Sequence, residues 1–180
     1  MDDSVPRRSF LRDEFHGLTL QATVQRARIY APGVSEPSRV PFQAALRRAL
    51  DTLAKRYATS VDEQRHVENI ARLADDLSSE HGSVLMAGRL RIGPAQKALN
   101  LFLKYLWCAG VIPTPPHCPF DRLVIQLFPP RDRANWTTLD SLDGYRGLVS
   151  AARRLAGTRS LAEWELVAYN EVSMAARRAT

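Results

Sequence analysis

Two lysines and one aspartate between residues 93 and 122 are the side chains best suited to chemistry. Of the 25 basic residues, only Lys55, Lys97 and Lys104 are lysines, and two of these three fall in this segment. A lysine amine can lose its proton and attack a carbon atom, whereas an arginine stays charged. Where arginine is the prevailing cation, Lys97 and Lys104 are therefore candidate nucleophiles, with chance placement as the alternative.

Helical spacing would bring these two lysines onto one face of a helix. The polar positions, which are three, four and three residues apart, are Lys97, Asn100, Lys104 and Trp107. The opposite side would be core and carries Leu99, Phe102, Leu103 and Leu106. The polar face is then either the wall of a site or an ordinary solvated stripe with a half-packed indole.

Asp121 is the acid that the chain could bring against this face. Residues 111–119 include four prolines and form a stiff connector that leads to Asp121. We expect this connector to fix the carboxylate beside Lys97 or Lys104. An acid at this position can also do no more than cap the backbone N–H groups of a following helix.

The same segment resembles the helix–hairpin–helix DNA glycosylase superfamily. The resemblance rests on Gly-Pro-Ala-Gln-Lys-Ala at 93–98, a hydrophobic helix, and then Pro-Phe-Asp at 119–121. Arg91 stands where the hairpin of that family has its first glycine, and Lys97 lies two positions beyond the family's lysine. The longer spacing and displaced lysine are more similar to an archaeal subgroup that acts on 8-oxoguanine.

The resemblance implies a DNA partner and a base-excision reaction on a damaged or modified base, without a cofactor. Asp121 would supply the essential carboxylate, and Lys97 or Lys104 would attack the sugar carbon once the base is flipped out. The DNA backbone would be held at the hairpin by Arg89, Arg91 and Gly93. The flipped nucleotide would be bound by Asn100, Tyr105, Trp107, His117 and Arg122.

Two other functions fit these residues. A non-catalytic nucleic-acid-binding protein would contact phosphates through the hairpin N–H groups and nearby arginines, without chemistry. An all-helical protein-interaction module would use the aromatic residues Phe102, Tyr105, Trp107 and Phe120. A zinc site formed by Cys108, His117 and Cys118 is disfavoured, because the chain lacks CxxC and HxxxH spacing.

Composition is typical of one folded domain spanning 1–180. Of the 180 residues, 45% are hydrophobic and 24% charged. Residues 91–180 contain 12 basic against 7 acidic side chains, compared with 13 against 12 in residues 1–90, and this asymmetry suggests an anionic partner. Without a long apolar run or a visible secretory signal, we expect no membrane partner, a cytoplasmic location and reduced cysteines. The oligomeric state is left open.

The elements that must position these residues are helices. Apolar periodicity predicts an all-α, orthogonal helical domain with a helix–hairpin–helix-like element. Helices are expected near 9–30, 42–57, 60–81, 94–108, 140–155 and 160–176, with a short helix or strand at 120–128. Ser60 with Glu63, and Ser160 with Glu163, have the spacing of capping boxes. Proline-rich loops are expected at 31–41 and 111–119.

Overall fold

The central element is helix α4 (Ile92–Cys108), which carries both candidate lysines. All of its residues from 92 to 104 are buried. Helices α1 (Ser4–Ala27), α2 (Glu36–Ala54), α3 (Glu63–His81) and α6 (Leu142–Ala156) all pack against it. Its polar side chains are therefore enclosed by other helices, and the solvated polar stripe that the sequence also allowed does not exist.

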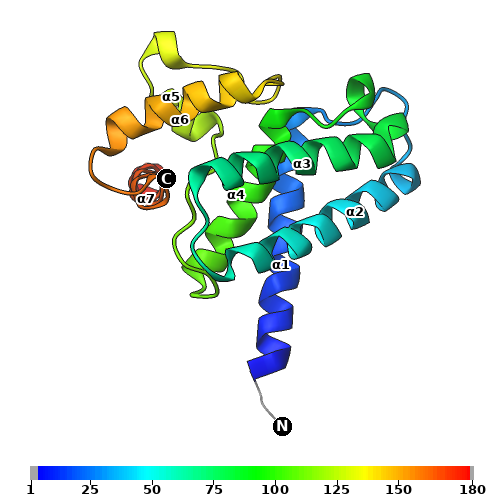
Figure 1. Ribbon diagram of the computed structural model, residues 1–180, viewed down its shortest axis with the longest axis horizontal. Coiled ribbons are helices and arrows are strands. Elements are labelled where there is room, and N and C mark those ends of the chain that lie inside the picture. The colour runs from blue at the N-terminus through cyan, green and yellow to red at the C-terminus, as the bar shows by residue number, and fades with distance from the viewer. Residues whose placement is uncertain (1–3, 179–180) are drawn as a thin grey trace.

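The structure is a computed structural model that describes residues 4–178, and within that range it is all-α, as predicted (Figure 1). Helix α1 runs across α2 and α3, and α5 (Arg122–Gln126), α6 and α7 (Leu161–Arg178) gather at the other side of α4. Short 3-10 turns are η1 (Lys55–Ala58), η2 (Gly82–Val84), η3 (Met86–Gly88) and η4 (Pro130–Asp132). The extended contact in this part of the chain is a single antiparallel bridge between Tyr30 and Leu85.

The two predicted capping boxes have different outcomes. The second is confirmed: the Glu163 N–H donates to Ser160 Oγ at 3.2 Å, and the Ser160 N–H donates to Glu163 Oε2 at 3.3 Å. The first is wrong, because α3 begins at Glu63 and its N-cap is Asp62, whose carboxylate accepts the Arg65 N–H at 2.8 Å. An acid two residues after Ser60 takes the capping position that the serine was expected to fill.

The two proline-rich loops also differ. Residues 111–119 are non-helical, as predicted. The predicted loop at 31–41 is too long, since α2 already begins at Glu36 and includes Pro37 and Pro41. A proline in the first turn removes only an N–H that has no helical partner, so Pro37 is compatible with the start of a helix. No helix among residues 4–178 is both long and apolar enough to cross a membrane.

Candidate functional site

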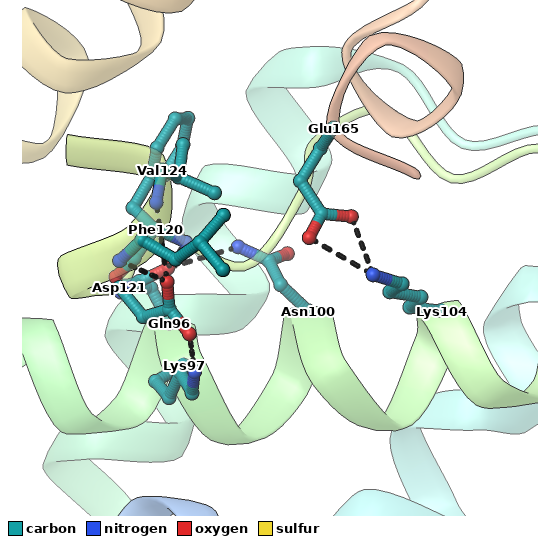
Figure 2. Close-up of polar contacts among 9 residues, drawn as sticks. Gln96, Lys97, Asn100, Lys104, Phe120, Asp121, Val124 and Glu165 are labelled. Atoms are coloured by element: carbon teal, nitrogen blue, oxygen red, sulfur yellow. Dashed lines mark hydrogen bonds and ion pairs between the residues drawn. The ribbon is translucent and has the colours of Figure 1, made fainter. Parts of the chain in front are cut away.

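Two lysine–carboxylate pairs lie along the buried polar face of α4 (Figure 2). Lys97 contacts Asp121, at the end of the proline-rich connector, and Lys104 contacts Glu165 of α7. The connector thus brings Asp121 to Lys97 and not to Lys104. The side chains of Lys97 and Asp121 are 7% and 25% exposed, so solvent reaches this pair mainly from the carboxylate's side.

The two oxygens of Asp121 have separate roles. Oδ1 accepts the backbone N–H groups of Leu123 at 2.9 Å and Val124 at 3.3 Å, which makes Asp121 the N-cap of α5. Oδ2 accepts the Lys97 amine. The capping role predicted from the sequence is therefore confirmed, and the same carboxylate also forms the contact with the lysine. The N-terminus of a helix favours a negative charge, which suits an ionised acid here.

Gln96 fixes the connector to α4 immediately before Asp121. Its Nε2 donates to the Phe120 carbonyl at 2.8 Å, and its Oε1 accepts the Phe120 N–H at 3.1 Å. Phe120 is itself completely buried. Because both backbone groups of Phe120 are held by one side chain of α4, the next residue is presented to Lys97, one position along the helix (Figure 2).

Lys104 has a more enclosed partner. Its Nζ lies 2.9 Å from Oε1 and 2.7 Å from Oε2 of Glu165, and 4.4 Å from the centre of the Tyr169 ring. Only 4% of the Glu165 side chain is exposed. Burial raises the pKa of the Glu165 carboxyl, and the Lys104 ammonium opposes that rise.

A hydrogen-bonded network of uncharged side chains lies between the helices near Asn100. The Asn100 oxygen is 2.8 Å from His66 Nε2, and its amide nitrogen is 3.3 Å from the Tyr145 hydroxyl. That hydroxyl lies 2.6 Å from His117 Nδ1, and His66 Nδ1 lies 2.7 Å from the Tyr57 hydroxyl. Burial lowers the pKa values of His66 and His117 to about 3, so both imidazoles are neutral near pH 7.

A pocket of about 420 Å³ lies beside the Lys97–Asp121 pair. Its walls come from α1, α5 and the loop before α6, and they include Arg26, Arg122, Asn135 and Trp136. Lys97 and Asp121 do not line it. Trp136 is the residue that links the pocket to the ion pair. It lines the pocket, and the Lys97 Nζ lies 5.6 Å from the centre of its indole ring.

The residues predicted to bind a flipped nucleotide are mostly elsewhere. Asn100 and His117 are completely buried in the polar network, so neither presents a side chain to solvent. Tyr105 stacks on Phe15 with ring centres 5.3 Å apart, and Trp107 is half-buried against the core. Of the predicted set, Arg122 lines the pocket.

Gly93 and Arg91, expected to contact a DNA phosphate at the start of α4, are instead bonded within the fold. The Gly93 N–H donates to the Leu139 carbonyl at 2.8 Å, and a Cβ at position 93 would lie 1.7 Å from the Trp136 carbonyl oxygen. This glycine is needed for close packing, and its N–H is not presented to a ligand. Arg91 is also used internally, donating to the carbonyls of Thr137 at 2.9 Å and Ala27 at 2.7 Å.

Other predicted residues have different surroundings. Arg89 is exposed and lies 3.2 Å from Asp140. Cys108 is exposed and Cys118 is buried, and both are free thiols. Among residues 4–178 no cluster of three His, Cys, Asp or Glu side chains could hold a metal ion. The aromatic surface proposed for a protein partner is wrong in part, because Phe102 and Phe120 are fully buried.

Sequence reasoning missed the residues that complete this region. Glu165 belongs to a helix far along the chain, and only the tertiary fold pairs it with Lys104. Trp136, in an irregular loop, gave no periodic signal. Gln96 could have been noticed, because a polar residue inside an otherwise apolar turn of a buried helix needs a hydrogen-bond partner.

Comparison with protein-family models, with curated proteins and with solved structures found no match to this chain.

Proposed function

We propose that this chain is a DNA-binding protein that excises a damaged or modified base and forms a covalent bond to the sugar through Lys97. The observation that carries the proposal is the contact between the Lys97 amine and the Asp121 carboxylate, next to a pocket walled by Trp136 and Arg122. An amine and a carboxylate in contact are the pair of groups that nucleophilic displacement at a sugar carbon requires.

The chemistry assigns one role to each group. The Asp121 carboxylate stabilises the positive charge that develops on the sugar as the bond to the base weakens. The proton that Lys97 must lose passes to the departing base, and the neutral amine then attacks the anomeric carbon. The base leaves with the electron pair of the broken bond and takes up a proton, and the new carbon–nitrogen bond rearranges to a Schiff base as the sugar ring opens.

The charge distribution supports an anionic substrate. The chain has a net charge of +6. Its excess of basic residues is concentrated after residue 90, in the half of the chain that contains Lys97, Asp121 and most of the pocket wall. Such an excess draws a polyanion toward the surface, and the attraction weakens as salt is added.

Trapping with borohydride tests the proposal directly. The protein is incubated with short duplexes that carry 8-oxoguanine, uracil, an alkylated purine or an abasic site, and the Schiff base is reduced to a stable adduct. We expect an adduct with at least one duplex and its complete loss in Lys97→Met. In Asp121→Asn, base release should slow by about 10²- to 10⁴-fold.

Two controls separate chemistry from folding. Lys55→Met removes the exposed third lysine and should leave the adduct unchanged. Lys104→Met combined with Glu165→Leu replaces the other pair by apolar groups and should also leave it unchanged. If no duplex of the panel shows base release or an adduct, the enzymatic claim is refuted.

A second candidate function, nucleic-acid binding without chemistry, is favoured by one observation. Asp121 already makes three contacts, with Lys97 and with the N–H groups of Leu123 and Val124, as a purely structural carboxylate would. In that case duplex binding is steeply salt-dependent, no adduct forms, and Lys97→Met changes stability but not affinity.

A further inference from the structure

The pocket beside Lys97 and Asp121 differs in charge from the arginine-lined groove between α2 and α3. Among its lining residues are Arg26 and Arg122, and none of them is acidic. The groove between α2 and α3 also has arginines, including Arg48 and Arg72, but Asp76 and Glu80 line it too. The groove between α2 and α3 therefore has two acids to offset its three arginines, Arg48, Arg56 and Arg72, whereas the pocket beside Lys97 and Asp121 has two arginines and no acid.

The two pocket arginines are also free of partners within the described part of the chain. Arg26 and Arg122 are both exposed, and neither makes a salt bridge or a side-chain hydrogen bond with residues 6–172. Their neighbours behave differently. The Arg91 guanidinium is bonded to two backbone carbonyls, and the Arg133 guanidinium is bonded to those of Phe128 and Gln126. Fold-stabilising contacts thus account for Arg91 and Arg133 but not for the pair in the pocket.

The remaining polar groups of the pocket are arranged to donate hydrogen bonds. The Asn135 side-chain oxygen accepts the Thr137 N–H at 3.0 Å and the Thr137 hydroxyl at 2.7 Å. With that oxygen occupied inside the turn, the Asn135 amide N–H₂ group is the part of the side chain left to meet a ligand. Gln126 offers a further amide on the same wall.

We infer that this pocket binds a phosphate group of the nucleic-acid strand on which Lys97 acts, between Arg26 and Arg122. Guanidinium groups match phosphate oxygens in geometry and charge, and amide N–H groups add neutral donors. Trp136 forms one wall of the pocket and lies under the Lys97 amine, so a phosphate held here is adjacent to the sugar that the amine would attack. The identity of the ligand as nucleic acid rests on the proposed function.

The first arm of the test uses inorganic phosphate. Proton–nitrogen spectra follow the indole N–H of Trp136 and the Nε–H groups of Arg26 and Arg122 while phosphate is added, with chloride at equal ionic strength as the reference. We expect saturable shifts of these three signals with phosphate only. The double variant Arg26→Gln with Arg122→Gln should lose the shift of the Trp136 signal. No saturable shift in the wild type, or the same Trp136 shift in the double variant, would overturn the proposal.

The second arm uses a duplex of about 12 base pairs. The double variant should bind it about 10- to 100-fold more weakly, because two charge-assisted contacts are lost. The plot of log affinity against log salt should become less steep by about 1, because one phosphate contact is lost. The matched control is Arg48→Gln with Arg72→Gln, which removes the same charge from the groove between α2 and α3 and should leave the Trp136 shift unchanged and the duplex affinity within about twofold.

The outcomes distinguish this inference from the proposed function. Phosphate binding with unchanged duplex affinity in the double variant would refute the nucleic-acid strand as the source of the phosphate. Loss of duplex affinity in the double variant, together with no borohydride adduct in the wild type, would support the phosphate site and refute only the chemistry at Lys97.

Discussion

The two ion pairs of α4 use the same residue types in different surroundings. Lys97 meets an acid that is 25% exposed, caps helix α5 and lies next to a pocket, whereas Lys104 meets one that is 4% exposed. A buried charge without a counter-charge strongly destabilises the folded state, so Lys104 and Glu165 must remain paired. Both lysine side chains are buried, 7% exposed for Lys97 and 11% for Lys104, so it is the exposure of the acid that separates an accessible pair from an architectural one.

The largest effect should come from breaking the enclosed pair. Glu165→Gln leaves the Lys104 ammonium buried without a counter-charge, so we expect the free energy of unfolding to fall by about 3–5 kcal/mol. Urea denaturation measures it. Replacing both partners, with Lys104→Met and Glu165→Leu, should restore most of this loss. If the double variant is as unstable as the single one, packing rather than charge explains the effect.

Filling the close contact between Gly93 and the Trp136 backbone should destabilise the loop that forms the pocket wall beside the accessible pair. Gly93→Ala places a methyl group against the Trp136 carbonyl, and neither backbone segment can move away easily. We expect the free energy of unfolding to fall by about 3 kcal/mol. The control is Gly147→Ala in α6, where a Cβ meets nothing within 4 Å and should stabilise the helix by about 0.5–1 kcal/mol. Thermal unfolding of both variants is the measurement, and equal changes would show that the close approach at Gly93 is not limiting.

Lowering the pH should destabilise the fold through the two neutral histidines, His66 and His117, of the network around Asn100. In the unfolded chain an imidazole takes up a proton near pH 6.5. In the folded chain burial lowers the pKa of His66 and His117 to about 3, so both stay neutral at pH 5. Stability is therefore lost as the pH falls below about 6.5, by about 2 kcal/mol between pH 6 and pH 5.

Glu165 acts in the opposite direction. Its raised pKa means that the folded state takes up this proton first, which favours folding as the pH falls. Urea titrations at the two pH values give the slope. The change in the free energy of unfolding between pH 6 and pH 5 should be about half as large in His117→Gln. An unchanged value would assign the acid sensitivity to other groups.

The smallest effect should come from the accessible pair. Asp121→Asn keeps an oxygen that can cap α5 and loses only the charge, on the side that water reaches. We expect a loss of about 1 kcal/mol in the free energy of unfolding, well below that of Glu165→Gln. A loss as large as for Glu165→Gln would show that the two pairs are energetically alike and would remove the contrast between them.

Much of the fold could be predicted from local patterns. Apolar spacing indicated α3, α4 and α6, and the pair Ser160 and Glu163 marked the start of α7 within one residue. These features are local because a helix satisfies its own backbone and its caps lie within one turn. The start of α3 was misplaced because Ser60 and Asp62 are both good caps, and nothing local decides between them.

The candidate site was less predictable. The connector, with its four prolines, did indicate that Asp121 returns to α4, and the lysine spacing placed two amines on one face. Which lysine meets Asp121 depends on Gln96 holding Phe120, and Lys104 is occupied by a residue 61 positions away. Such choices are made by tertiary contacts between distant segments, and a single sequence has no pattern that reports them.

The amide of Gln96 has a consequence for how this chain can change in length. It pairs with the backbone of Phe120 on both sides, much as one strand pairs with its neighbour, and so sets where the connector rejoins α4. Insertions at the exposed positions 113–114 would alter only the path taken to that anchoring point. A residue added between Phe120 and Asp121 would move the acid away from its amine, so the chain should tolerate insertions on one side of Phe120 and not on the other.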